Sequence, residues 1–95
     1  MDMARVVGIR AGIPKEAPAF TVNRLCGSGV QAIVSAGQAI QTGDAEVVLA
    51  GGTESMSRGA YWIDNARWGG RMGDTSLVDA VVGCLTDPFN EIHMG

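Results

Sequence analysis

One short stretch, NRLCGSGVQA from Asn23 to Ala32, carries the residue types that could do covalent chemistry. A cysteine thiol becomes a strong nucleophile once it ionises, and a helix N-terminus favours ionisation through its backbone N–H groups and dipole. Gly27 and Gly29 allow a sharp turn after Cys26 and leave room for a substrate. The same turn would aim the Cys26 backbone N–H at a developing oxyanion. Strand, nucleophile, glycine turn and helix together indicate a nucleophile elbow, with cysteine in place of serine.

Two other interpretations of this stretch stay open. An unpaired cysteine is most often a small buried hydrophobic residue. The second interpretation is a dinucleotide-binding loop, because Gly27, Gly29 and Ala32 fit the spacing G-x-G-x-x-A. Glu54 is the acidic residue of that fingerprint, but it follows Gly51-Gly52 instead of ending a strand, so its contact with a ribose would be misplaced. No G-x-x-x-x-G-K-[ST] sequence occurs, which excludes a P-loop.

The residues on either side of Cys26 predict the elements that would position it. Ala19–Leu25 is rich in β-branched and aromatic residues and predicts a strand. From Gly27 to Thr42 apolar residues recur every three or four positions, which predicts a helix ended by Gly43. The apolar run Glu46–Ala50 predicts a second strand, buried on both faces. Together these elements predict a right-handed βαβ unit and the α/β fold class.

The flanking regions predict two further helices. Met3–Ala11 is expected to form a short helix with Asp2 as its N-cap and Gly12 as its stop. The residues 57–71 show no periodicity and predict irregular structure. A last helix is expected to begin at Ser76 with an S-x-x-D cap signature and to end at an Asp-Pro pair.

This set of elements does not make a complete fold. Two parallel strands that are buried on both faces need more strands and helices to cover them than 95 residues supply. We therefore expect a segment of a larger fold, or a chain that another chain completes.

Composition narrows the function classes. A net charge of −3 without a basic cluster argues against nucleic acid and anionic membranes as partners. The longest uncharged stretch, Leu25–Gly43, is interrupted by glycines and polar residues, whereas a membrane span needs about 20 mostly apolar residues. The first residues lack the apolar core of a signal peptide. Cys26 and Cys84 form no C-x-x-C pair, so we expect no metal site and a reducing, cytoplasmic location.

Four motifs resemble the thiolase family, and most closely its bacterial acetyl-CoA acetyltransferases and β-ketothiolases. In order, they are VNRLCGSG from Val22, AGGTESMS from Ala50, MGD from Met72 and HMG from His93. They extend over nearly all of the chain after residue 21. The resemblance implies an incomplete thiolase fold. Residues 1–56 would be the C-terminal part of the N-terminal α/β domain, with its β-Cys-α-β unit, and residues 57–95 the start of the loop domain.

The resemblance also implies an acyltransferase that performs a reversible Claisen condensation of acyl-CoA thioesters, or thiolysis of a 3-ketoacyl-CoA. Cys26 matches the family's nucleophile and would carry the acyl group as a thioester, with its backbone N–H in the oxyanion hole. Leu85, His93 and Met94 would line the channel for the pantetheine arm of coenzyme A, and a further role of His93 stays open. Coenzyme A thioesters are the expected substrates, with no other cofactor and no metal.

The family's assembly implies a homo-oligomer, a dimer of dimers. The segment 60–78 matches the position of a tetramerisation loop, and its aromatic residues, including Trp68, fit an interface as well. Packing beneath a loop is the alternative. Ala19–Leu25 resembles a strand that pairs across the family's dimer axis, and Cys84 is expected to be a core thiol in an apolar helix.

Three further motifs of the family do not occur in these 95 residues: N-E-A-F, G-H-P and C-x-G-G-G, whose cysteine deprotonates the second acyl-CoA. We therefore expect the chain to be inactive alone and to need the remainder of a thiolase chain as its partner. Two other functions stay open. One is a non-catalytic association module of a truncated or split product. The other is a relative of the ketoacyl synthases, which share the strand–Cys–helix arrangement but take carrier-protein substrates.

Overall fold

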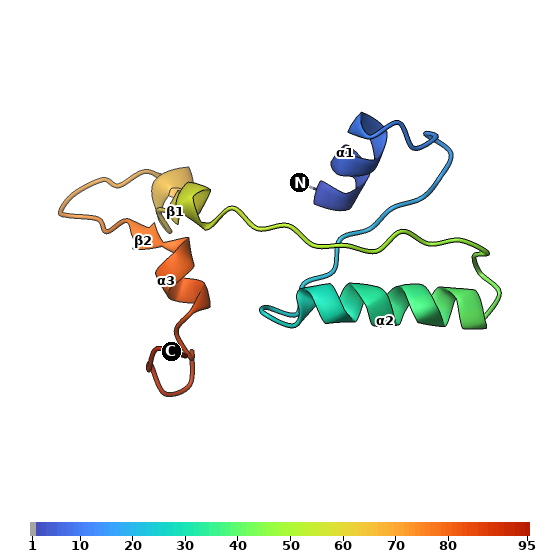
Figure 1. Ribbon diagram of the computed structural model, residues 1–95. Coiled ribbons are helices and arrows are strands. Elements are labelled where there is room, and N and C mark those ends of the chain that lie inside the picture. Colours follow the sequence, from blue (N-terminus) through green and yellow to red (C-terminus); the bar gives the residue numbers. More distant parts are fainter. Residues whose placement is uncertain (1) are drawn as a thin grey trace. The chain divides into compact units, whose positions relative to one another are not determined.

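The computed structural model describes residues 2–95, and the chain divides into two compact units (Figure 1). The N-terminal unit extends to Gly52 and contains helices α1, Met3–Arg10, and α2, Ser28–Gln41. The C-terminal unit runs from Thr53 to Gly95 and contains two short strands, two 3₁₀ helices and helix α3, Ala80–Cys84.

Helix α1 begins as its sequence predicted, with Asp2 as the N-cap. The Asp2 carboxylate accepts a hydrogen bond from the Arg5 N–H at 3.4 Å. It also accepts one from the Thr21 hydroxyl at 2.6 Å, and the Thr21 oxygen in turn accepts one from the Ala4 N–H at 3.1 Å. These bonds, first that from Thr21 and then that from Arg5, hold the pKa of Asp2 below its usual value. The start of α1 is thereby tied to a segment 19 residues further along the chain.

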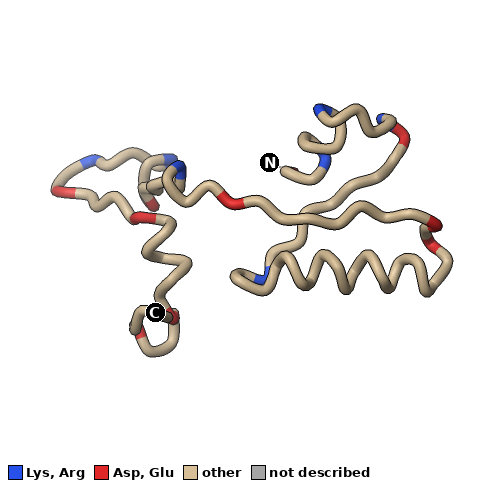
Figure 2. The backbone as a smooth tube through the Cα atoms, viewed as in Figure 1, with Lys and Arg blue, Asp and Glu red and all other residues tan. Residues whose placement is uncertain are grey.

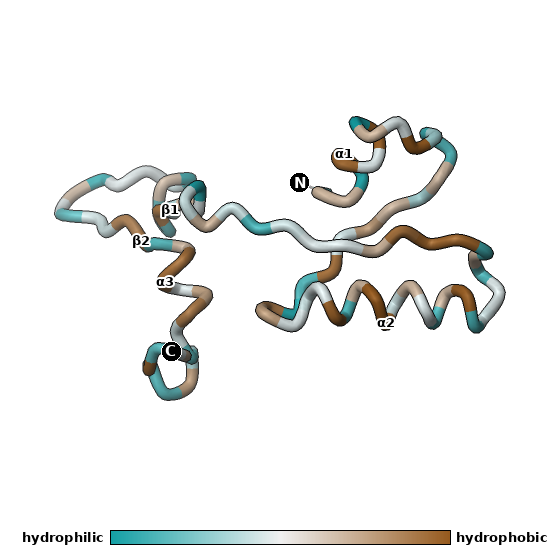
Figure 3. The backbone as a smooth tube through the Cα atoms, viewed as in Figure 1, coloured by the Kyte–Doolittle hydropathy of each residue, from teal (hydrophilic) through white to brown (hydrophobic). Residues whose placement is uncertain are grey.

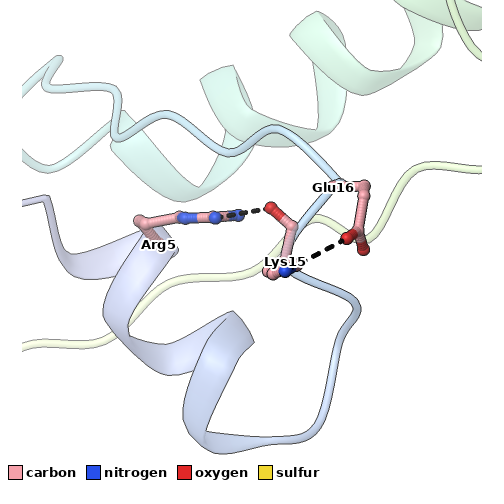
Figure 4. Close-up of polar contacts among 3 residues, drawn as sticks. All are labelled: Arg5, Lys15 and Glu16. Atoms are coloured by element: carbon pink, nitrogen blue, oxygen red, sulfur yellow. Dashed lines mark hydrogen bonds and ion pairs between the residues drawn. The ribbon is translucent and has the colours of Figure 1, made fainter.

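The loop after α1 is closed by the Arg5 side chain (Figure 4). The guanidinium donates to the carbonyl oxygens of Lys15 and Ala17, both at 2.6 Å. The neighbouring ion pair, Lys15 Nζ to Glu16 Oε1 at 3.9 Å, is solvent-exposed and adds little, because water screens exposed pairs. The loop therefore depends on two charge-assisted hydrogen bonds to backbone oxygens.

Helix α2 lies within one residue of its predicted bounds at each end. It contains no charged side chain, which Figure 2 shows as an uninterrupted tan helix. Gly43 follows it with a φ of 79°, a left-handed conformation that glycine adopts without steric cost. The Asp44 N–H then donates to the Ala39 carbonyl at 2.9 Å and closes the end of the helix. Gly12, with a φ of 88°, ends α1 in the same way, also as predicted.

The two strands predicted around α2 are not formed. Within residues 2–95, strand pairing is limited to two short strands of the C-terminal unit and two isolated bridges. Ala19–Leu25 and Glu46–Ala50 therefore remain outside any ladder, and the predicted βαβ unit is absent from the described chain. The physical reason is that a strand needs a neighbour for its backbone N–H and C=O groups, and the described residues supply none here. The second segment nevertheless ends beside α2, since a Cβ at Gly52 would lie 3.9 Å from the Gly29 Cα.

The C-terminal unit is built on a two-residue ladder between strands β1, Tyr61–Trp62, and β2, Val78–Asp79. The strands are antiparallel, with Tyr61 opposite Asp79 and Trp62 opposite Val78. A hydrogen bond to Asp79, and then the charge of this carboxylate, raise the pKa of the Tyr61 hydroxyl. The 3₁₀ helices Met56–Arg58 and Ala66–Trp68 precede and follow β1.

The last helix begins later than its sequence predicted. Ser76 was expected to cap it, but α3 starts at Ala80, and its N-cap is Asp79, whose carboxylate accepts from the Val81 N–H at 2.8 Å. Residues expected in the first turn of the helix pair with β1 instead. The helix ends at Cys84, before the Asp-Pro pair that was expected to stop it.

Two close contacts hold α3 on the elements before it. The ring of Trp62 covers Gly83, where an added Cβ would lie 3.2 Å from the ring. An added Cβ at Gly59 would overlap the Val81 side chain. Glycine at these two positions lets an aromatic ring and a branched side chain approach the backbone.

No residue between 2 and 95 is buried, apolar residues included. The solvent-accessible surface of the chain is 8414 Å². If each unit were a compact folded domain of half the chain's mass, the two together would expose only about 6300 Å². Figure 3 shows hydrophobic residues along α2 and along the segment that follows it, and Val47 and Leu49 are 88% and 83% exposed. Neither unit therefore has a hydrophobic core of its own. None of the described helices has the length and apolar character needed to cross a bilayer.

Candidate functional site

The thiol of Cys26 lies immediately before the first turn of α2. Gly27 is the N-cap of the helix, and within the described chain no side chain accepts a hydrogen bond from the first-turn N–H groups at this cap. Cys26 is unpaired and exposed. The predicted placement of the cysteine at a helix N-terminus is therefore correct, and the alternative of a buried cysteine does not describe this chain.

The backbone reverses at Cys26 through two short-range hydrogen bonds. The Gly27 N–H donates to the Arg24 carbonyl at 3.0 Å, and the Ser28 N–H donates to the Leu25 carbonyl at 3.1 Å. Leu25 itself has a φ of 48°, the left-handed region that a leucine rarely adopts. The residue directly before the thiol is therefore held in a strained conformation.

Side chains from both ends of this turn hold Leu25. The Leu25 N–H donates to Asn23 Oδ1 at 3.0 Å. The Ser28 hydroxyl donates to the Leu25 carbonyl at 2.6 Å and accepts from the Arg24 N–H at 2.8 Å. Asn23, Leu25 and Ser28 were not predicted to hold the turn, because its glycines alone were expected to form it. The signal was present, since asparagine and serine near a turn bond to the backbone two to four residues away.

A second connection runs along the surface of α2. The Arg24 guanidinium donates to Gln31 Oε1 at 2.9 Å, and Gln31 Nε2 donates to Ser35 Oγ at 3.2 Å. Arg24 therefore contacts the helix through its backbone and through its side chain. Both contacts place the residues before Cys26 against the first two turns of α2.

The glycines around the thiol differ in what they permit. At Gly27 an added Cβ would lie 3.4 Å from the Arg24 carbonyl oxygen, which is ordinary contact, whereas at Gly29 it would meet no atom of the described chain within 4 Å. Gly52 lies near this position, since a Cβ added at Gly52 would lie 3.9 Å from the Gly29 Cα. The first residues of the AGGTESMS motif are therefore brought to the end of α2 that carries Cys26.

The C-terminal unit brings together the three residues assigned to a substrate channel. Leu85 and Met94 are joined by a hydrogen bond of 2.8 Å from the Met94 N–H to the Leu85 carbonyl. His93 forms a bridge with Thr86 in the same pairing. The His93 ring is held by the Gly95 N–H, which donates to Nδ1 at 2.9 Å. Together these residues close the neck of a loop.

Asp87 stabilises the interior of that loop. Its carboxylate accepts from the Phe89 N–H at 3.0 Å and from the Asn90 side chain at 2.7 Å, and these bonds lower the pKa of Asp87. The Asp87 N–H donates to the Ile92 carbonyl at 2.9 Å. The loop between Asp87 and Ile92 is therefore held by hydrogen bonds within it.

Two other residues of the C-terminal unit lie at the surface. Cys84 was expected to be a core thiol, but it is exposed, because α3 is only five residues long and no element of the described chain covers this side of it. Its Sγ donates to the Val81 carbonyl at 3.1 Å. Trp68, in the segment assigned to an oligomer contact, is 80% exposed.

The arrangement at Cys26 can support attack on an electrophilic carbonyl. A thiol on a tight turn, followed by a helix whose first-turn N–H groups no side chain caps, offers a nucleophile and oxyanion donors in one place. A group of three or more histidine, cysteine, aspartate or glutamate residues that could hold a metal ion is not found among residues 2–95. The thiol and the N–H donors beside it fit covalent chemistry at sulfur.

Comparison with known proteins gives one consistent family. The sequence profile "Thiolase, N-terminal domain" matches residues 1–95. Beta-ketothiolase BktB of Cupriavidus necator is 58% identical over 95 residues, which is 100% of this chain and 24% of that enzyme. This chain thus spans about a quarter of the length of the curated relatives that it matches.

Solved structures give the same result. The crystal structure of the Bacillus anthracis acetyl-CoA acetyltransferase superposes with a TM-score of 0.91 at 42% identity, over 98% of this chain and 24% of that one. The crystal structure of human mitochondrial 3-ketoacyl-CoA thiolase in complex with CoA gives a TM-score of 0.90 at 53% identity, over 97% of this chain and 24% of that one. The mixed helices and extended segments described above therefore correspond to part of the fold of these enzymes.

Proposed function

Because this chain belongs to the thiolase family by its match to the family's N-terminal domain, we propose that it supplies the acyl-accepting nucleophile of an acyl-CoA C-acetyltransferase. The observation that carries the proposal is the exposed Cys26 thiol at the uncapped N-terminus of α2. The strained turn before it supports the same assignment, since such strain is concentrated at functional sites.

In the first half-reaction, Cys26 Sγ attacks the thioester carbonyl of an acyl-CoA. The Sγ–C bond forms while the carbonyl oxygen becomes an oxyanion, which accepts a hydrogen bond from the Cys26 backbone N–H. The intermediate collapses by breaking the C–S bond to coenzyme A. Coenzyme A leaves as a thiol after taking up the proton that Cys26 gave up, and the acyl group stays on Cys26 as a thioester.

In the second half-reaction, the α-carbon of a second acyl-CoA, after loss of a proton, attacks the Cys26 thioester. A C–C bond forms, the C–Sγ bond breaks, and 3-ketoacyl-CoA leaves while Cys26 regains a proton. Thiolysis is the reverse. A base must remove the α-proton, and we place it in the part of a thiolase that lies beyond the quarter matched here. On its own, the chain would therefore not turn over.

For substrate binding we propose that Leu85, His93 and Met94 line the channel for the pantetheine arm of coenzyme A. The support is that one short pairing gathers all three at the neck of a hydrogen-bonded loop. The human 3-ketoacyl-CoA thiolase was solved in complex with CoA, which agrees with this class of ligand. We further propose that residues 1–56 belong to the family's N-terminal domain and 57–95 to its loop domain, and that the whole enzyme is a homo-oligomer.

The test uses a hybrid enzyme, the beta-ketothiolase of Cupriavidus necator with its matching segment replaced by this chain. Incubation with isotope-labelled acetyl-CoA is expected to give a thioester on Cys26, read by mass spectrometry of tryptic peptides. Cys84→Ala is the matched control, because Cys84 is the other exposed thiol, and it should still label. Cys26→Ala should not label and should lose thiolysis. Label on Cys84 instead, or normal thiolysis by Cys26→Ala, would refute the assignment.

A second candidate function is a non-catalytic association module. None of residues 2–95 is buried, so the exposed apolar side chains are available to a partner chain. Co-expression with a separate fragment that carries the rest of a thiolase distinguishes the two functions. Restored thiolysis favours a split enzyme, whereas a stable complex without thiolysis favours the module.

A further inference from the structure

We propose that Ser28 is a positioning residue, whose hydroxyl locks the turn that presents Cys26. The inference rests on the proposed function of Cys26 and adds a residue to it. The Ser28 Oγ accepts from the Arg24 N–H at 2.8 Å and donates to the Leu25 carbonyl at 2.6 Å. One hydroxyl group thus bonds to the peptide groups on both sides of the strained Leu25.

The hydroxyl does not serve the usual purpose of a serine at the start of a helix. A capping serine accepts from N–H groups two or three residues further on. Here Gly27 occupies the N-cap position, and among residues 2–95 the Ser28 oxygen bonds only to Arg24 and Leu25, which precede it in the chain. Alanine is a good helix former, so removing the hydroxyl should leave α2 intact.

The direction of these bonds determines what their loss would do. Without the hydroxyl, Leu25 keeps the bond from its own N–H to Asn23, but loses the side-chain bond to its carbonyl. A leucine so released should leave the left-handed region for a more favourable conformation. That rotation moves the peptide between Leu25 and Cys26, and with it both the sulfur and the backbone N–H that faces the oxyanion. Displacement by about 1 Å can reduce a reaction rate about 100-fold.

The experiment compares single variants of the hybrid enzyme by single-turnover acylation with acetyl-CoA. Ser28→Ala is expected to slow acylation of Cys26 about 10- to 100-fold, with little change in the acetyl-CoA concentration that half-saturates it. Ser28→Thr retains an oxygen at the same position and is expected to restore most of the rate. Ser76→Ala, the same change at an exposed serine of the C-terminal unit, is the matched control and should be neutral.

Asn23→Ala gives a second and independent variant, since it removes the bond to Leu25 from the other side. It is expected to slow acylation in the same way as Ser28→Ala. Far-ultraviolet circular dichroism of each variant tests whether the fold is kept. The proposal would be overturned by Ser28→Ala acylating at the parent rate, by Ser28→Thr as slow as Ser28→Ala, or by an equal loss in Ser76→Ala. Failure of Cys26 to acylate in the unaltered hybrid would instead refute the proposed function.

Discussion

At the residue scale, the feature that distinguishes this chain is the neighbourhood of Leu25 and Cys26. A leucine in the left-handed region costs about 1–2 kcal/mol, and the hydrogen bonds from and to Asn23 and Ser28 offset that cost. Such bonds fix the orientation of the next residue along the chain. The reactivity of Cys26 is therefore expected to depend on side chains that never touch a substrate.

Asp2 gives a pH-dependent test at the same scale. Its pKa is lowered in the folded chain, so its contribution to stability is complete above the unfolded value of about 3.9 and is lost as the pH falls through the lower folded value. The start of α1 and its tie to Thr21 should therefore loosen in acid below about pH 4. Amide hydrogen exchange of Ala4, whose N–H donates to Thr21, measures this directly.

Asp2→Asn is the control for that titration. Asparagine can still cap the helix, but it carries no ionisable group. Protection of the Ala4 amide in Asp2→Asn should therefore not change between pH 5 and pH 3. An acid transition that survives in Asp2→Asn would show that another group causes it.

At the element scale, the bounds of α2 depend on the residues at its ends as much as on its apolar pattern. Gly43 adopts a φ that side chains disfavour, whereas Gly37 lies within the helix and an added Cβ there would meet nothing within 4 Å of the described chain. The same substitution at these two glycines should therefore have opposite effects. Such a pair separates backbone conformation from the general effect of adding a methyl group.

Gly43→Ala is expected to destabilise the end of α2 by about 1–2 kcal/mol, because alanine is strained in the left-handed region. Gly37→Ala is expected to stabilise the helix by about 1 kcal/mol, because alanine is the better helix former. Circular dichroism at 222 nm during urea titration of the chain measures both. Loss of helix in Gly37→Ala would contradict the open surroundings of that glycine.

The contact between Gly59 and Val81 gives a second prediction at this scale. Gly59→Ala would force the new methyl group into the Val81 side chain, at a cost of about 1–3 kcal/mol. The Ala80 N–H, which donates to the Ala60 carbonyl at 3.0 Å, should then exchange faster with solvent. Gly70→Ala is the control in the same unit, because its Cβ would meet only Asn65 at 3.8 Å. Equal exchange in the two variants would rule out the contact.

The elements also show how far the sequence alone could lead. Helix ends were predictable because Asp2, Gly12 and Gly43 act through local backbone geometry that the residue type determines. The strands predicted on either side of α2 could not be predicted in the same way, because strand pairing depends on a neighbouring strand that can lie anywhere in a fold. The start of α3 was misplaced since Asp79 fits both a capping box begun at Ser76 and an N-cap of its own. The position of Cys26 before α2 was predicted correctly, but its support by Ser28 was missed.

At the scale of the whole molecule, the decisive feature is that residues 2–95 form no hydrophobic core. Val47 and Leu49 lie almost fully exposed, although their sequence is typical of a strand buried on both faces. We expect the remainder of a thiolase fold to cover them. The isolated chain should therefore bind hydrophobic dyes and self-associate.

The double variant Val47→Glu/Leu49→Glu tests this at the same scale. In the isolated chain it should reduce dye binding and self-association, measured by fluorescence and sedimentation velocity. In the hybrid enzyme it should prevent folding, because charged groups would then be buried without partners. The control, Gln38→Glu/Ser57→Glu, adds the same charge at exposed polar positions and should have neither effect. A hybrid that tolerates glutamate at 47 and 49 would show that the segment stays at the surface.

The turn at Cys26 has a further consequence in time. Each of its hydrogen bonds joins residues no more than four positions apart. Contacts this local close within about 10–100 ns, whereas a ribosome adds only about 5–20 residues per second. The shape around Cys26 can therefore arise while the residues after it are still being synthesised. A peptide of residues 20–43 that shows a positive φ at Leu25 by nuclear magnetic resonance would demonstrate this independence, and an unstructured Leu25 would disprove it.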